Sequence, residues 1–132
     1  MIEMIGDLIM GIIGLIKKGE FTKASVEIEN AFHEFLKEDA AFFFAIPKEK
    51  ITETLLNEHN YTHGHLEILS ELMFAQSELS FAKNNYAECL EFTEKALILT
   101  EYVINTSDTY SADKESRVEL LKERVESLNN LK

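Results

Sequence analysis

The stretch KGEFTKASVEIENAFHEF, residues 18–35, decides the fold of this chain, because it holds a turn followed by a strongly periodic helix. Its apolar and small residues recur at steps of three and four, at Phe21, Ala24, Ile28, Ala31, Phe32 and Phe35. This is the period of an α-helix with one buried face. Gly19 stands just before it and marks the end of a preceding helix. The stretch therefore predicts two consecutive helices joined by a tight turn.

The same pattern returns 65 residues later, in KNNYAECLEFTEKALILT at residues 83–100. Each copy has a turn residue, an aromatic residue two later, a small residue three after that, and a second small residue seven further on. Small residues let two helices approach closely, and glycine or asparagine suits a left-handed turn. We expect these positions to pack the helix pairs: Gly19, Phe21, Ala24 and Ala31 in the first copy, and Asn84, Tyr86, Cys89 and Ala96 in the second.

The rest of the chain extends this pattern into an all-α fold. One proline and five glycines among 132 residues leave few breaks between helices. Thr62 is a candidate N-cap, and Asn85 is a second one with Glu88 as its capping-box partner. We expect a single domain over residues 1–132, built as a stack of antiparallel helix pairs with about five to six helices. The expected helices cover residues 2–18, 21–37 and 48–57. A loop at 60–64 then leads into a helix that ends near residue 83, and two more helices follow at 86–105 and 113–129.

These residues resemble the tetratricopeptide repeat, whose consensus has glycine, an aromatic residue, alanine, and a later alanine followed by a large apolar residue. The two repeat-like units cover about residues 5–36 and 70–101, with an insertion at 39–58 and a C-terminal capping helix at 113–130. The chain also resembles a family of small uncharacterised bacterial proteins with divergent repeats. The resemblance implies that the first helices of the pairs line a groove for a peptide or protein. The lysines and asparagines of the groove that grips a peptide carboxylate have no counterpart here.

The charge excludes some partners. Acidic residues outnumber basic ones 24 to 13, which gives a formal net charge of −11. Nucleic-acid binding draws most of its affinity from basic side chains, so we expect no DNA or RNA partner. An anionic membrane surface is disfavoured for the same reason, while a basic partner would match the charge. The lone Cys89 excludes an internal disulfide and favours the reducing cytoplasm.

The N-terminal helix is apolar on nearly every side, from Met1 to Ile16. It is too short, and with Glu3 and Asp7 too charged, to span a membrane. A helix apolar all round must be covered all round, so we expect a homodimer through it. The alternatives are a central helix wrapped by the insertion and the last helix, or a helix lying on a membrane surface. The expected interface residues are Ile5, Ile9, Ile12 and Ile16, together with Phe42, Phe43 and Phe44 of the insertion.

Catalysis has no candidate residues. The chain holds no glycine-rich phosphate loop and no nucleophile elbow. We therefore expect a non-enzymatic protein-interaction or scaffold module without a cofactor. The only candidate metal ligands are His59, His63 and His65, which lie within seven residues of one another. They make a metal-binding protein a further alternative.

Overall fold

The computed structural model describes residues 2–131, with side chains from Ile5 onward. Over these residues the chain is helical and contains no strand, which confirms the all-α class. Seven α-helices and one π-helical turn replace the five or six helices that we expected. The elements are α1 (Ile2–Lys17), α2 (Phe21–Ala31), η1 (Phe32–Leu36), α3 (Ala40–Phe44), α4 (Ile51–Glu58), α5 (His63–Ala82), α6 (Tyr86–Asn105) and α7 (Ala112–Asn130).

Two equivalent turns join α1 to α2 and α5 to α6. Gly19 and Asn84 both take the left-handed conformation, with φ of 79° and 63°. The amide of Glu20 donates to the carbonyl of Leu15 at 2.9 Å, and 65 residues later Asn85 donates to Ser80 at 2.9 Å. This pattern is a Schellman motif, which satisfies the last carbonyls of a helix and reverses the chain. The two turn sequences thus form the same local structure.

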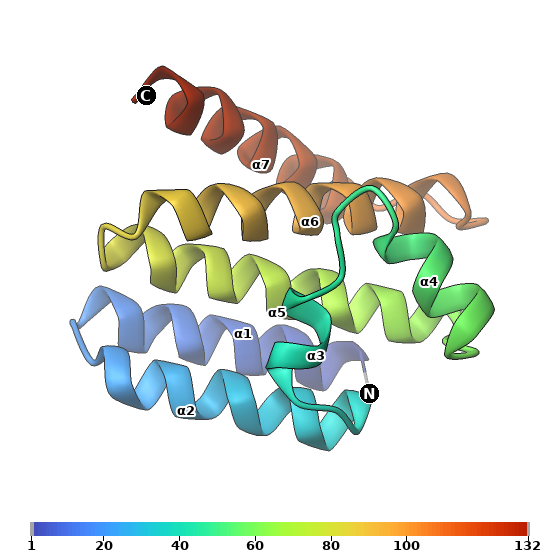
Figure 1. Ribbon diagram of the computed structural model, residues 1–132, viewed down its shortest axis with the longest axis horizontal. Coiled ribbons are helices and arrows are strands. Elements are labelled where there is room, and N and C mark those ends of the chain that lie inside the picture. Colours follow the sequence, from blue (N-terminus) through green and yellow to red (C-terminus); the bar gives the residue numbers. More distant parts are fainter. Residues whose placement is uncertain (1, 132) are drawn as a thin grey trace.

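The two helix pairs lie side by side, with α5 in the middle (Figure 1). α5 packs against α1, α2 and α6, and α7 packs against α6. The small residues expected at the pair interfaces are buried: Ala24, Ala31, Cys89 and Ala96. Their aromatic partners differ, because Phe21 is half-buried whereas Tyr86 is exposed and rests against Phe81. Close approach at the small residues therefore accounts for more of the packing than the aromatic anchors do.

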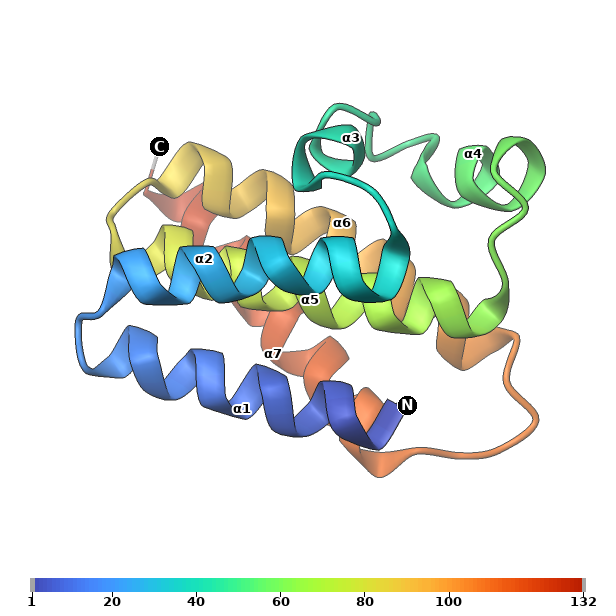
Figure 2. The ribbon, with the colours of Figure 1, turned by 90° about the horizontal axis from the view of Figure 1, so that it is seen from below.

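The segment between the two pairs folds over α2 and α6, on the opposite side of the molecule from α1 (Figure 2). Its three phenylalanines point in different directions. Phe43 is fully buried and stacks on Phe32, with ring centroids 5.4 Å apart. Phe44 lies against Phe92 of α6, while Phe42 meets the ring of His59 edge-on. The short α3 was not expected, and α4 begins three residues later than the helix expected after Pro47.

The N-terminal helix differs from our expectation. Ile5, Ile9, Ile12 and Ile16 are all buried within the single chain, where α1 packs on α2 and α5. They are therefore core residues and not an interface between two chains. The insertion does not wrap α1 either, since α1 lies at the other edge of the stack (Figure 2). Met1 and the side chains of Ile2 and Met4, which the sequence places on the same apolar helix, lie outside the described residues.

Of the two N-caps predicted from the sequence, at Thr62 and Asn85, only the one at Thr62 forms. The Thr62 hydroxyl accepts the amide of His65, and the His65 ring in turn accepts the amide of Thr62. This is a capping box closed by histidine in place of the usual glutamate. Asn85 makes no side-chain cap bond, so the box expected with Glu88 does not form. None of the helices within residues 2–131 has the length and apolar character that crossing a bilayer requires.

Candidate binding cleft between α1, α5 and α7

A cleft of about 660 Å³ opens between α1, α5 and α7. Its floor includes the buried side chains of Ile5, Ile9 and Val103. The insertion packs on the other side of α5 and does not line this cleft. The cleft walls are therefore the first helices of the two pairs, with the C-terminal helix as the third wall.

The α7 wall is fixed to α5 by three ion pairs. Glu67 pairs with Lys114 at 3.1 Å and Glu71 with Arg117 at 3.1 Å. Further along, Glu78 pairs with Arg124 at 3.0 Å. Exposed pairs of this kind contribute little, but these side chains are mostly covered and act together. They attach α7 to α5 and so position it as a wall of the cleft.

Each arginine of this seam also covers an aromatic ring. The Arg117 guanidinium lies 3.8 Å from the centre of the Phe74 ring, and Arg124 lies 4.1 Å from that of Phe81. The two groups, each of a glutamate, an arginine and a phenylalanine, are separated by seven residues on both helices. A cation over an aromatic face is worth about 0.5–2 kcal/mol, depending on desolvation. The seam therefore combines charge and ring contacts that repeat every two helical turns.

The rim of the cleft carries exposed apolar side chains, and the residues that line the cleft have a net negative charge. Met10 on α1 is 74% exposed and Leu120 on α7 is 43% exposed, and both line the cleft. Four acidic side chains line it as well, against the two basic ones Lys114 and Arg117. Both basic groups are already paired with Glu67 and Glu71. This leaves the carboxylates of Asp7 and Asp113 as the net charge of the cleft.

Two regular spacings in the sequence correspond to this site. Glu71 and Phe74 recur seven residues later as Glu78 and Phe81, and the arginines of α7 have the same spacing. These spacings alone do not predict the site, because nothing local in the sequence shows that α7 returns to α5. Of the residues singled out from the sequence, Ile5 and Ile9 line the cleft. The repeat-packing residues and Phe42, Phe43 and Phe44 do not line it.

The histidine group predicted as a metal alternative is not brought together. His63 Nε2 lies 3.1 Å from the carbonyl oxygen of Val103, and His65 is occupied in the cap of α5. His59 packs its ring against Phe42, with centroids 4.8 Å apart. In the part of the chain that is described, the one triplet of converging ligand atoms belongs to Glu29, His33 and Asp39.

Two lysines attach the insertion to α6. Lys95 is almost wholly buried, and its Nζ donates to the carbonyl oxygen of Phe44 at 2.7 Å, at the end of α3. Burial lowers the pKa of Lys95 below its ordinary value, and the charge of Glu91 opposes this only in part. Lys48 pairs with Glu94 at 2.7 Å, and this hydrogen bond raises the pKa of Lys48. A buried amine thus binds the end of α3, and a half-buried ion pair supports it.

Comparison with known proteins gives no match: no protein-family model, no curated protein and no solved structure corresponds to this chain. The resemblance to tetratricopeptide repeats therefore rests on the residues quoted from the sequence. What the molecule binds has to be argued from the side chains of the cleft.

Proposed function

We propose that this chain is a non-enzymatic protein-interaction domain that holds a basic helical segment of a partner protein in the α1–α5–α7 cleft. The observation that carries the proposal is the cleft itself, with exposed apolar side chains on its rim and acidic groups beside them. Amphipathic helices bind in apolar grooves through side chains spaced three and four residues apart. The lone, buried Cys89 is compatible with a reducing cytoplasm as the compartment.

The tetratricopeptide-like interpretation supports this proposal. If α1–α2 and α5–α6 are two repeat units, then α1 and α5 are the first helices of their pairs. In tetratricopeptide domains these helices line the peptide groove, and here both line the cleft. α7 would then act as the capping helix, and it supplies the third wall. Fewer than three repeats rarely form a stable solenoid, so the capping helix and the insertion would complete the core.

Charge selects the kind of partner. The basic side chains of the cleft are neutralised by their own glutamates, whereas Asp7 and Asp113 remain to attract cations. The whole chain adds a formal charge of −11, which would steer a basic segment toward it. Apolar anchors would contact Met10 and Leu120, while lysine or arginine at the flanks would meet the two aspartates. An acidic segment would be repelled by the same groups.

We expect Gly6→Arg to weaken binding of a basic amphipathic helical peptide by roughly tenfold or more, because the new side chain enters the cleft and repels the ligand. Gly6 lines the cleft, and no atom lies within 4 Å of a Cβ built there. Replacing a helical glycine should also raise stability by about 0.5–1 kcal/mol, so unfolding would not explain the loss. Fluorescence anisotropy with a labelled leucine–lysine peptide measures the affinity.

Gly11→Arg is the matched control. It makes the same change on the same helix, also into open space, but about 140° further round at 3.6 residues per turn. Gly11 does not line the cleft, so this variant should bind the peptide as the parent chain does. Equal binding by the parent chain and Gly6→Arg would contradict the proposal. Stronger binding of a leucine–glutamate peptide would contradict the charge argument.

A second copy of the chain is the alternative occupant of the cleft. The homodimer first expected through the isoleucines of α1 would now have to use the exposed rim at Met10. Light scattering on a sizing column, at two concentrations tenfold apart, distinguishes these cases: a stable mass near twice 15.1 kDa that Gly6→Arg halves would favour self-association. The alternative of a membrane-surface helix is weakened because the isoleucine stripe of α1 is used inside the fold.

A further inference from the structure

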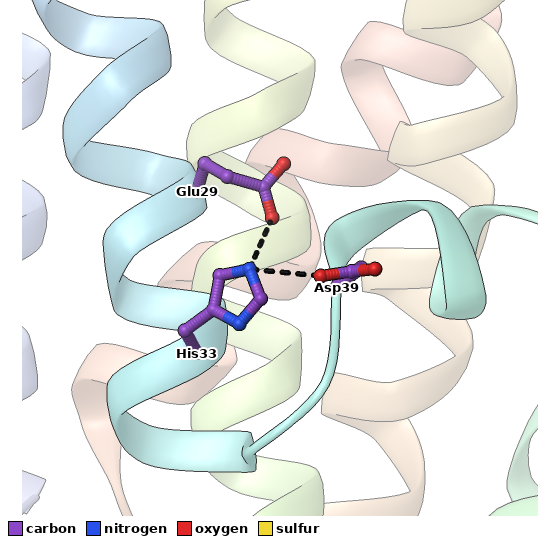
Figure 3. A group of neighbouring side chains, drawn as sticks. All are labelled: Glu29, His33 and Asp39. Carbon is purple, nitrogen blue, oxygen red and sulfur yellow. Dashed lines mark ion pairs between the residues drawn. The ribbon is translucent and has the colours of Figure 1, made fainter.

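Two carboxylates from different parts of the chain converge on one imidazole nitrogen. His33, in the π-helical turn η1, points its Nε2 at Asp39 Oδ1, 2.9 Å away, and at Glu29 Oε2, 3.5 Å away (Figure 3). Glu29 comes from the end of α2, and Asp39 stands just before α3. The ligand atoms of the three all lie within 4.8 Å of one another. None of them belongs to the cleft described above.

The Asp39 carboxylate faces His33 and does not cap the helix that follows it. Its backbone is extended, at φ −70° and ψ 149°, which is the conformation of a helix N-cap. Aspartate is among the best capping residues, yet its side chain makes no cap bond to α3. Glu29 supplies that bond instead, since its Oε2 accepts the amide of Ala40 at 3.0 Å. One carboxylate is thus anchored by the backbone, and the other is free to face His33.

The donor set and its spacing suit a metal ion. A neutral imidazole offers a single N–H or a single lone pair at Nε2, so it cannot satisfy two carboxylates at once. A tetrahedral zinc ion with bonds of about 2.0–2.1 Å places its ligand atoms roughly 3.3 Å apart. The nitrogen–oxygen distances of 2.9 and 3.5 Å lie on either side of that value. A dipositive ion would also balance the two carboxylate charges.

We propose that Glu29, His33 and Asp39 bind a divalent transition-metal ion of the zinc class. The nitrogen ligand disfavours magnesium and calcium, which prefer oxygen ligands alone. With three protein ligands, a water molecule would complete the coordination. The ion would tie the end of α2 to the start of α3, and so it would fix the insertion to the first helix pair. This role is separate from peptide binding on the opposite side of α5.

The test is calorimetric titration of zinc chloride into the metal-free full chain. We expect one zinc per chain, with binding in the parent and in the His59→Ala variant alike. His33→Ala should weaken it by more than the roughly 10- to 100-fold that loss of a mere supporting contact costs. Asp39→Asn, which keeps the shape of the side chain, should also weaken binding. Both sites are exposed, so circular dichroism should report an unchanged fold for each variant.

Cobalt(II) gives a second measurement, because its absorption spectrum reports nitrogen and oxygen coordination directly. Loss of the spectrum in His33→Ala, with its retention in His59→Ala, is the expected result. Absence of zinc binding up to millimolar concentration would overturn the proposal. It would equally be overturned by unchanged binding in His33→Ala and Asp39→Asn, or by a loss that follows His59→Ala instead. Gly6→Arg should bind zinc normally, which separates this result from the test of the cleft.

Discussion

Replacing Phe43 with alanine should lower the free energy of unfolding by about 3–5 kcal/mol. Phe43 is fully buried, and its ring stacks on Phe32 at 5.4 Å and lies 6.1 Å from that of Tyr61. Truncation removes this buried surface and leaves a cavity between the insertion and the end of α2, where the short α3 cannot collapse far. Urea unfolding monitored by circular dichroism measures the loss, provided that the transition stays two-state.

Phe42→Ala is the matched control, since it makes the same truncation one residue earlier. The Phe42 side chain is half-buried and meets the His59 ring edge-on at the surface. Because less apolar area is lost, we expect a cost of about 1 kcal/mol. A similar cost for both variants would contradict the different burial of the two rings. It would mean that the insertion is not anchored through Phe43.

The sequence predicted the long helices because their information is local. The 3.6-residue period, Gly19 and the Lys83–Asn85 turn place the end of α1, the start of α2, the end of α5 and the start of α6 within one or two residues of their observed bounds. The far end of the second helix was expected at residue 37, whereas α2 ends at Ala31 and the chain continues as the π-helical turn η1. The Schellman turns follow from the same residues, since both need a left-handed position. The repeat at a 65-residue shift, read from the letters alone, corresponds to matching hydrogen bonds at the two turns.

The insertion was less predictable because its structure depends on distant contacts. α3 has five residues, too few to be stable alone, and its end is held by Lys95 from another helix. Its start is held by Glu29, eleven residues earlier. No local pattern in three consecutive phenylalanines specifies such partners. The capping box shows the same limit, since the side chain at Asn85 could cap and does not.

What covers the isoleucine stripe of α1 could not be assigned from the sequence either. Because the helix is apolar on nearly every side, we expected a homodimer through Ile5, Ile9, Ile12 and Ile16 in preference to a core position. In the structure the stripe Ile5, Ile9, Ile12 and Ile16 is buried where α1 packs on α2 and α5 of the same chain. The opposite face, including Met10, is what remains for a partner. The cleft depends on how α1 packs against α5 and on the position of α7 against α5. Neither feature follows from a local pattern in the sequence.

Lys95→Ala should lower the free energy of unfolding by about 2–4 kcal/mol. The variant loses the buried stem of the side chain and leaves the carbonyl of Phe44 without its charged donor. The loss is offset in part, since a buried ammonium group is costly to desolvate. Lys95→Met separates the two effects, because it keeps the unbranched stem and removes only the charge and the hydrogen bond. We expect Lys95→Met to cost less than Lys95→Ala near neutral pH.

The pH dependence of that difference tests whether the charge is buried. Burial lowers the pKa of Lys95 in the folded chain below 10.5, so between the lowered value and 10.5 the unfolded chain binds more protons. Stability of the parent chain must therefore rise with pH through this window, whereas Lys95→Met has no such contribution. Shifts of Lys48 and Tyr61 are common to both proteins and cancel in the difference. Urea unfolding at pH 7.5 and at pH 10 should show the parent gaining stability relative to Lys95→Met. The contrary result is a difference in unfolding free energy, parent minus Lys95→Met, that stays constant or decreases as the pH rises. It would mean that water or Glu91 stabilises the charge of Lys95. The hydrogen bond to the Phe44 carbonyl would then not lie in a site that excludes water.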